Sequence, residues 1–212
     1  MKITTPNSKS KLLDAALHVI RLKGYTATTI DDICASASLT KGSFFHHFKS
    51  KEDLALAAVD HWSVMTGGLF AQAAYQQLAD PRDRVLAYLD LRAEILQGEL
   101  PDFTCLLGTM VQETYETHPR IRDACEAGIS SHAETVGVHI AAAKAKYAPN
   151  ATWDAATLAL YTQAVIQGAF ILAKAQGKAE IAALCIGHLR CYVEGLLTPG
   201  SPFSKPQLKE TP

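Results

Sequence analysis

The sequence has few cysteines, and their number and spacing argue against a disulfide-bonded secreted domain. Its 212 residues include five cysteines, an odd number, and none of them forms a Cys-x-x-Cys pair. The chain also lacks an apolar N-terminal signal segment and a run of 18 apolar residues of the kind that crosses a membrane. We therefore expect a cytoplasmic protein with reduced thiols and no membrane partner.

Residue patterns that carry catalysis or hold metal ions are missing as well. The sequence contains no nucleophile motif, no phosphate-binding loop and no Glu-x-x-His pair. His46 and His47 are adjacent, so on a helix their side chains diverge by about 100° and cannot chelate one ion. His132 and His139 share a helical face but stand two turns apart. We expect no enzyme activity, no cofactor and no metal site, and a helical enzyme is the rival class.

Charge is unevenly distributed along the chain, although its net value is only −1. Residues 1–51 contain eight Lys and Arg against three Asp and Glu, whereas residues 52–212 contain twelve against eighteen. A basic segment on an acidic remainder is expected when only one end of a protein meets nucleic-acid phosphate. The alternative is chance clustering of surface charge.

Three helix starts follow one another closely between residues 28 and 53. Thr29 is a good N-cap, and Asp32 stands at the third helical position, where a capping box usually has Glu. Thr40 can cap a second helix, and Ser50 with Asp53 can cap a third. This spacing predicts two short helices joined by a tight turn and followed by a longer helix.

The second of these short helices has one apolar face. Phe44 and Phe48 stand four residues apart and are expected to point inward. The outward positions are then occupied by Lys41, Ser43, Phe45 and His47. Two short helices, the second of which presents Lys, Ser and aromatic groups, are typical of a helix-turn-helix.

The run TTIDDICASASLTKGSFFHHFKSKEDL, from Thr28 to Leu54, resembles the DNA-binding signature of TetR-family transcriptional regulators. It departs from the usual pattern at Ser38, where Gly is usual, and at Phe44 and Phe45, where Leu-Tyr is common. Asp31 is a further oddity, because phosphate repels an acidic group close to the bases. The remainder of the chain resembles the family only in its architecture.

The resemblance implies DNA contacts at particular positions of this segment. Lys41, Gly42 and Ser43 occupy base-facing positions, and Phe45 and His47 occupy positions that lean on the sugar-phosphate backbone. Since Phe45 lacks the hydroxyl of Tyr, its contact is expected to be apolar. Thr29 and Lys51, on either side of this helix, are expected to contact phosphate. The predicted DNA-binding residues are Thr29, Thr40, Lys41, Gly42, Ser43, Phe45, His47 and Lys51.

Helical periodicity and helix breakers continue to the C-terminus and predict an all-α protein of about nine helices. Gly98 to Asp102 is expected to be a loop and Phe103 to Thr117 a helix. We predict a three-helix DNA-binding domain over residues 1–51 and a larger helical bundle for ligand sensing and dimerisation over 52–198. A flexible tail is expected at 199–212.

The last two predicted helices are apolar on more than one face, so each must be buried on more than one side. Small residues among them would allow a second subunit to approach closely. TetR-like proteins dimerise through their last two long helices, and the resemblance favours this reading over an internal helix pair in a monomer. The predicted interface residues are Val165, Gly168, Ala169, Leu172, Leu189, Tyr192 and Val193.

The segment from Thr104 to Gly108 resembles the start of the helix that lines the ligand cavity in TetR-like proteins. We expect an apolar pocket for a small apolar or amphipathic effector, formed by Leu69, Phe70, Leu89, Phe103, Cys105, Leu107, Met110, Tyr115, Trp153, Tyr161 and Phe170. The predicted function is a homodimeric repressor that binds double-stranded DNA at an inverted repeat and is released by the effector.

Cys105 supports an alternative function. Some TetR-family relatives with Cys at this place sense oxidants or electrophiles through the thiol. A cysteine near a helix N-terminus has its thiolate favoured by the helix dipole. The other interpretation is a buried, inert cysteine that packs as a small apolar residue.

Overall fold

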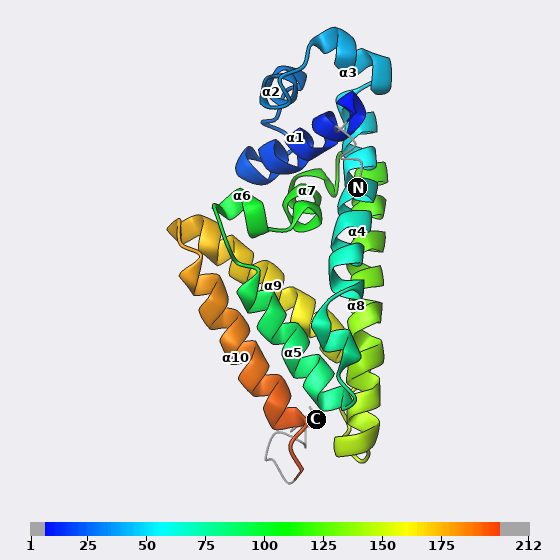
Figure 1. Cartoon of the computed structure of the whole chain (residues 1–212), viewed down its shortest axis with the longest axis vertical. Helices are drawn as coiled ribbons and strands as arrows, with labels where there is room; N and C mark the ends of the chain where they lie inside the picture. Colours follow the sequence, from blue (N-terminus) through cyan, green and yellow to red (C-terminus); the bar gives the residue numbers. More distant parts are fainter. Residues whose placement is uncertain (1–6, 200–212) are drawn as a thin grey trace, which may run out of the picture. The chain divides into compact units, whose positions relative to one another are not determined.

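The computed structural model describes residues 7–199, where the chain forms ten α-helices, one short 3-10 helix and no strand (Figure 1). In chain order they are α1 (Ser8–Lys23), α2 (Ile30–Ser36), α3 (Lys41–His47), α4 (Lys51–Ala71), η1 (Ala74–Gln77), α5 (Pro81–Glu94), α6 (Leu100–Phe103), α7 (Leu106–Thr114), α8 (Pro119–Tyr147), α9 (Ala155–Gln176) and α10 (Glu180–Leu196). The predicted all-α class is confirmed. The predicted tail lies outside the described residues from position 200 onward.

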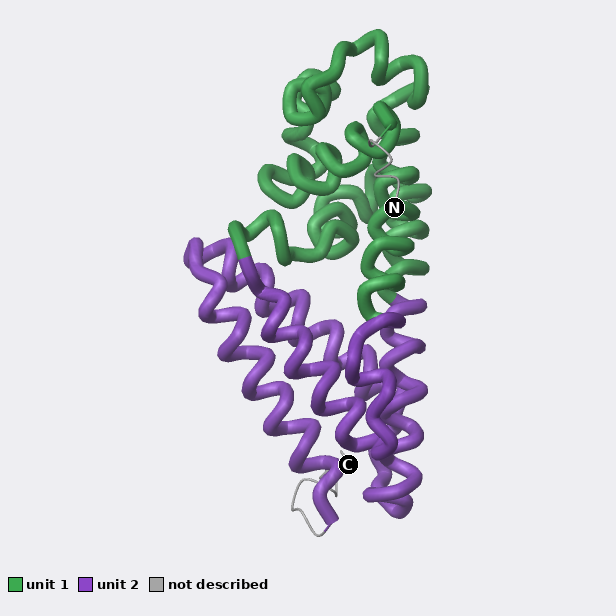
Figure 2. The backbone as a smooth tube through the Cα atoms, in the orientation of Figure 1, with its two compact units in different colours: residues 1–70, 98–129 green, residues 71–97, 130–212 purple. Residues whose placement is uncertain are grey.

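The helices group into two compact units (Figure 2). Among the described residues, the first unit comprises 7–70 and 98–129, and the second comprises 71–97 and 130–199. Helix α8 contributes its first part to one unit and its second part to the other. The expected boundary between residues 51 and 52 is a functional division, and it stays a prediction.

In the first unit, α1 packs against α2 and α3 on one side and against α6 and α7 on another. Its apolar core is continuous across these helices and includes Leu12, Ala16, Ile20, Ile33, Phe44, Leu54, Ala58, Leu106, Met110 and Ile121, all buried. The helix-turn-helix and the segment around α7 therefore share one core.

The three predicted helix caps are all present. Thr29 and Asp32 form a reciprocal capping box, in which Thr29 N–H donates to Asp32 Oδ2 at 2.7 Å and Asp32 N–H donates to Thr29 Oγ1 at 3.1 Å. Thr40 Oγ1 accepts from the N–H of Ser43 at 3.2 Å. Ser50 Oγ likewise accepts from the third residue after it. Local side-chain chemistry thus fixes where α2, α3 and α4 begin.

The turn between α2 and α3 contains a residue in the left-handed region. Ser38 has φ +54°, and it is the only non-glycine residue with positive φ in the described range. It stands at the position where the sequence resemblance leads one to expect Gly. A left-handed conformation costs a non-glycine residue about 1 kcal/mol, because Cβ crowds the following carbonyl oxygen. The helix-turn-helix forms with this turn strained.

The region from Gly98 to Thr117 differs from the prediction of a loop followed by one helix. The structure has two helices here, α6 and α7, separated at Thr104 and Cys105. The carbonyl oxygens of Asp102 and Thr104 accept hydrogen bonds from Arg21, so they are not used in a continuous helix. This break and the unforeseen η1 account for the elements beyond the nine expected helices.

In the second unit, α10 packs against both α9 and α5, and η1 packs against α5. A small polar cluster lies among the apolar residues: the Tyr88 hydroxyl is 2.9 Å from His132 Nε2 and accepts from Gln163 Nε2 at 3.4 Å. Burial, together with the positive charge of Arg92, lowers the pKa of His132 to about 4. His132 is therefore a neutral packing group at ordinary pH.

Two of the described helices, α4 and α9, are long and apolar enough to span a membrane by length and composition alone. This is weak evidence for a membrane protein, because core helices of globular domains meet the same criterion.

Candidate nucleic-acid interface

Helix α3 presents a short outward row of residues at its start. Lys41 and Gly42 are exposed, the Phe45 side chain is 56% exposed, and Ser43 is partly buried. Phe44 between them is fully buried in the core, as predicted. Thr40 uses a lone pair to cap the helix, so its hydroxyl proton remains available for a phosphate oxygen.

The ammonium group of Lys41 forms an ion pair with Asp31 on α2. Lys41 Nζ lies 2.9 Å from Asp31 Oδ1, and the two side chains are 59% and 68% exposed. An exposed pair of this kind stabilises a fold by at most about 1 kcal/mol. The position of this pair matters more than its strength, because Lys41, which is predicted to contact a base, is held by the carboxylate of Asp31.

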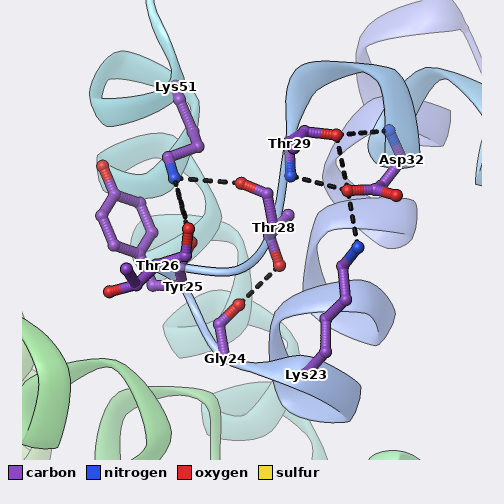
Figure 3. A network of polar contacts seen from close by, with 8 residues as sticks. All are labelled: Lys23, Gly24, Tyr25, Thr26, Thr28, Thr29, Asp32 and Lys51. Carbon is purple, nitrogen blue, oxygen red and sulfur yellow. Dashed lines mark hydrogen bonds and ion pairs between the residues drawn. The ribbon is translucent and has the colours of Figure 1, made fainter.

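Lys51, which was predicted to contact phosphate, is directed into the protein (Figure 3). Its Nζ donates to the carbonyl oxygens of Tyr25 and Thr28, both at 3.0 Å, and lies 3.5 Å from that of Thr26. It also lies 4.3 Å from the centre of the Tyr25 ring. Burial lowers the pKa of Lys51. In this conformation its ammonium group fastens the loop after α1 to the start of α4.

Thr29, the other predicted phosphate ligand, is engaged in its own cap. Its hydroxyl donates to Asp32 Oδ2 at 2.5 Å, and the same carboxylate forms an ion pair with Lys23 at 2.6 Å (Figure 3). The hydrogen bonds from Lys23 and Thr29 hold the pKa of Asp32 well below its usual range. To donate to a phosphate, the Thr29 hydroxyl would first have to break its hydrogen bond to Asp32.

His47 is tied to the start of α1. Its Nε2 lies 2.6 Å from Ser8 Oγ, and its side chain is partly buried. Three lysines near α3 or the start of α1 are exposed and form no ion pair within residues 7–199: Lys9, Lys11 and Lys49. Lys49 was not among the predicted contacts. Lys49 is one of the eight basic residues of segment 1–51, but the resemblance placed the phosphate contact at Lys51.

The structure distributes the predicted pocket residues between its two units. In the first unit, Phe70, Phe103, Leu107 and Met110 are buried, Cys105 is partly buried, and Leu69 and Tyr115 are exposed. In the second unit, Leu89 and Phe170 are buried, Trp153 is partly buried, and Tyr161 is exposed. Within the first unit, Leu107 and Met110 belong to the core beneath α1, and Cys105 packs against it.

A buried arginine joins α1 to the segment that precedes α7. The guanidinium of Arg21 donates to the carbonyl oxygens of Leu17 at 2.8 Å, Asp102 at 2.9 Å and Thr104 at 3.3 Å. It also lies 5.0 Å from the centre of the Trp62 ring. Burial lowers the pKa of Arg21, and the negative charges of Asp102 and an ionised Cys105 oppose that shift.

Cys105 is the N-cap residue of α7. Its Sγ accepts from the N–H of Gly108 at 3.5 Å, and its side chain is neither fully buried nor fully exposed. Within residues 7–199, no three His, Cys, Asp or Glu side chains form a group that could hold a metal ion.

The predicted dimer residues divide into two sets. Ala169, Leu189 and Val193 are buried within the chain itself. Leu172 and Tyr192 are 44% and 41% exposed, and Val165 and Gly168 are partly exposed. An exposed apolar face thus remains on α9 and α10, with Leu160, Tyr161, Ile171, Leu172, Leu184 and Tyr192 as its large members. The ring centroids of Tyr161 on α9 and Tyr192 on α10 lie 5.5 Å apart, so this face is continuous from one helix to the other.

A capped helix-turn-helix with an outward row on its second helix, attached to further helices, defines a DNA-binding protein of the helix-turn-helix class. Family models agree with this geometry. The model of "Bacterial regulatory proteins, tetR family" matches residues 12–58, and that of the "Transcriptional regulator LmrA/YxaF-like, C-terminal domain" matches residues 81–183. The chain belongs to the TetR family of transcriptional regulators.

Individual relatives are similar over shorter stretches. The transcriptional regulator AcuR of Cereibacter sphaeroides is 29% identical over 102 residues, which are 48% of this chain and 47% of AcuR. The negative transcriptional regulator IcaR of the biofilm operon icaADBC in Staphylococcus epidermidis is 36% identical over 53 residues, 25% of this chain and 29% of IcaR. The chain spans about half the length of the first of these relatives and less than a third of the second.

Solved structures are similar over nearly the whole chain. A TetR regulator from Chloroflexus aurantiacus has a TM-score of 0.76 and 28% identity, covering 88% of this chain and 94% of that one. A regulatory protein TetR from Rhodobacter sphaeroides has a TM-score of 0.78 at 23% identity, covering 87% and 97%. The reduced form of NemR from E. coli has a TM-score of 0.70 at 20% identity, covering 86% and 95%. The last two show likeness of fold alone.

Proposed function

We propose that this chain represses transcription as a homodimer that binds an inverted-repeat operator and leaves it when a small apolar or amphipathic effector binds. The observation that carries the proposal is the outward row of Lys41, Gly42 and Phe45 on the second helix of a fully capped helix-turn-helix. The similarity to IcaR, a negative regulator, supports repression. We assign DNA binding to residues 1–51 and sensing to residues 52–198, in a protein that acts in the cytoplasm.

Physical chemistry limits how such a dimer can work. Two-fold protein symmetry requires two half-sites in inverted orientation, about one helical turn or a multiple of it apart. Lysines on the DNA-binding face release counter-ions when they reach phosphate, so affinity must fall steeply as salt rises. The effector shifts the equilibrium only if it prefers the geometry in which the two DNA-binding domains no longer match successive grooves.

Replacing Lys41 or Lys49 by Ala is expected to weaken DNA binding in two different ways. Lys41→Ala should cost about 1–3 kcal/mol on the operator and much less on a scrambled duplex, because a base contact is lost. Lys49→Ala should weaken both duplexes alike and make the salt slope shallower by about one unit, because a phosphate contact is lost. Fluorescence anisotropy over a salt series, with an operator selected from random DNA, measures both effects.

The control is Lys146→Ala, in the second unit, which removes one positive charge outside the helix-turn-helix. It should leave both affinities unchanged within about twofold. Equal losses on operator and scrambled DNA for Lys41→Ala would make that lysine a phosphate anchor. Failure of the wild-type protein to select any duplex would overturn the proposed function.

A thiol-based response through Cys105 is the second candidate, favoured by the place of this residue at the N-cap of α7. Cys105→Ser should retain DNA binding, since Ser also caps helices, and should lose release of DNA by peroxide or quinones.

The matched control for this test is Cys191→Ser, because Cys191 is the exposed cysteine of the chain. That variant should respond to peroxide as the wild type does. Gel-shift titration with oxidant, followed by reductant, reports the response and its reversal. If peroxide releases DNA from Cys105→Ser as well as from wild type, the thiol has no sensing role and a reversible ligand remains as the signal.

A further inference from the structure

The acidic residue on the DNA-facing side of the helix-turn-helix has no role in the function described so far. Asp31 lies in the first turn of α2 and contacts Lys41, the first residue of α3, at 2.9 Å. Its neighbour Asp32 is fully engaged with Lys23 and the Thr29 cap. Asp31 makes no such cap. Its carboxylate is 68% exposed and is directed at the lysine that the proposed function places on a base.

A carboxylate at this place affects phosphate and base contacts differently. When Lys41 approaches a phosphate, the phosphate charge comes within a few ångströms of Asp31 and is repelled, which offsets the attraction to the lysine. A guanine edge carries no net charge and offers two acceptors, O6 and N7. The Lys41 ammonium has three N–H donors, so one can stay on Asp31 while two reach the guanine.

We propose that Asp31 is a specificity-determining residue, which holds the Lys41 ammonium toward a base edge and disfavours duplexes where that ammonium meets only phosphate. The inference rests on the proposed function, because it requires α3 to enter the major groove. It assigns Asp31 no contact with DNA of its own. Its action passes through Lys41, and the quantity it controls is the ratio of operator affinity to non-specific affinity.

Asp31→Asn tests this proposal, because Asn keeps the shape of the side chain and removes its charge. Affinities are measured for the duplex that wild-type protein selects from a random pool and for a scrambled duplex of the same length, over a salt series. We expect scrambled DNA to bind about three- to tenfold more tightly, with a smaller gain on the selected duplex. The salt slope on scrambled DNA should steepen by about one unit, as Lys41 becomes free for a phosphate.

Asp123→Asn is the matched control, since the Asp123 side chain is 67% exposed, against 68% for Asp31, and forms an ion pair with Arg122 at 2.8 Å on α8 of the same unit. It changes net charge by the same amount and should leave the affinity ratio unchanged. In the Lys41→Ala background, Asp31→Asn should no longer alter the ratio, because its effect requires the lysine. Thermal denaturation confirms that each variant is folded.

Two results would overturn the proposal while leaving the proposed function in place. One is an unchanged affinity ratio in Asp31→Asn, which would make the ion pair a surface contact without consequence. The other is the same change of ratio with and without Lys41, which would make Asp31 act by general repulsion or by its own base contact. Absence of any selected duplex for wild type would instead overturn the proposed function, and this inference with it.

Discussion

Replacing Arg21 by Met is expected to lower the free energy of unfolding by about 3 kcal/mol. The change removes the donor to the carbonyl oxygens of Asp102 and Thr104, which lie 81 and 83 residues away in the chain. Thr104 is fully buried, and a buried carbonyl that loses its donor costs about 1–3 kcal/mol, whereas the partly buried bond to Asp102 adds less. The third acceptor, Leu17, also lies within α1, so its loss matters less.

The sign of this effect needs an argument, because removing a buried charge can also stabilise a protein. Burying the Arg21 charge costs desolvation energy on folding, and Met avoids that cost. This gain offsets part of the stability lost with the hydrogen bonds. The carbonyl groups that remain unpaired are fixed by the break between α6 and α7, so they cannot find new donors without rebuilding that segment. The loss therefore exceeds the gain.

The measurement is thermal denaturation followed by circular dichroism, where about 3 kcal/mol corresponds to a midpoint roughly 6–12 °C lower for a chain of this size. Arg21→Lys keeps a positive charge beside Trp62 but has one nitrogen in place of the Nε that donates to Leu17 and the Nη1 that donates to Asp102 and Thr104, so it should lie between wild type and Arg21→Met. Arg122→Met, at an exposed ion pair, should change stability by less than about 0.5 kcal/mol. A midpoint for Arg21→Met within about 2 °C of wild type would contradict the expected loss of stability.

The helix-turn-helix could be predicted from sequence because its signals are local. A capping residue and its partner stand three positions apart, as Thr29 and Asp32 do, and the inward Phe44 and Phe48 are one helical turn apart. Such pairs meet in any chain that forms the helix. The caps and the buried face can therefore be predicted without knowledge of any tertiary contact.

The remaining features depend on contacts between distant segments, and sequence patterns do not report those. Lys51 has the composition of a phosphate contact, yet three carbonyl groups of the loop 25–28 surround its ammonium. At the division between α6 and α7, the carbonyl groups of Asp102 and Thr104 accept from Arg21, which is 81 and 83 residues away in the chain. No sequence pattern links Lys51 or Arg21 to the distant carbonyl groups that accept their hydrogen bonds.

The last two helices illustrate a different limit. Because α9 and α10 are apolar on several sides, periodicity cannot tell which apolar side packs inside the chain. The structure separates them: Ala169, Leu189 and Val193 are buried within the chain, while Leu172 and Tyr192 are exposed. Only the exposed side is available to a second subunit, and this determines how the dimer has to be tested.

Leu172→Glu is expected to convert the proposed dimer to monomers and to abolish operator binding. In a two-fold interface the substitution places two carboxylates, one from each subunit, in an apolar seam. The cost of burying them is several kcal/mol, so dimerisation should weaken at least about 100-fold. A monomer holds one half-site only and loses the gain from binding both. Sedimentation velocity and anisotropy with operator DNA measure the two consequences.

Two further substitutions make this experiment decisive. Val138→Glu introduces the same charge at another exposed apolar position of the second unit, 69% exposed on α8, and should leave the dimer intact. Ala169→Glu, at a position buried within the chain, should unfold the protein instead of separating subunits. Circular dichroism distinguishes the two failures. A folded Leu172→Glu protein that remains dimeric with unchanged operator affinity would place the interface on another face, because no stable two-fold seam tolerates an unpaired carboxylate beside its symmetry mate.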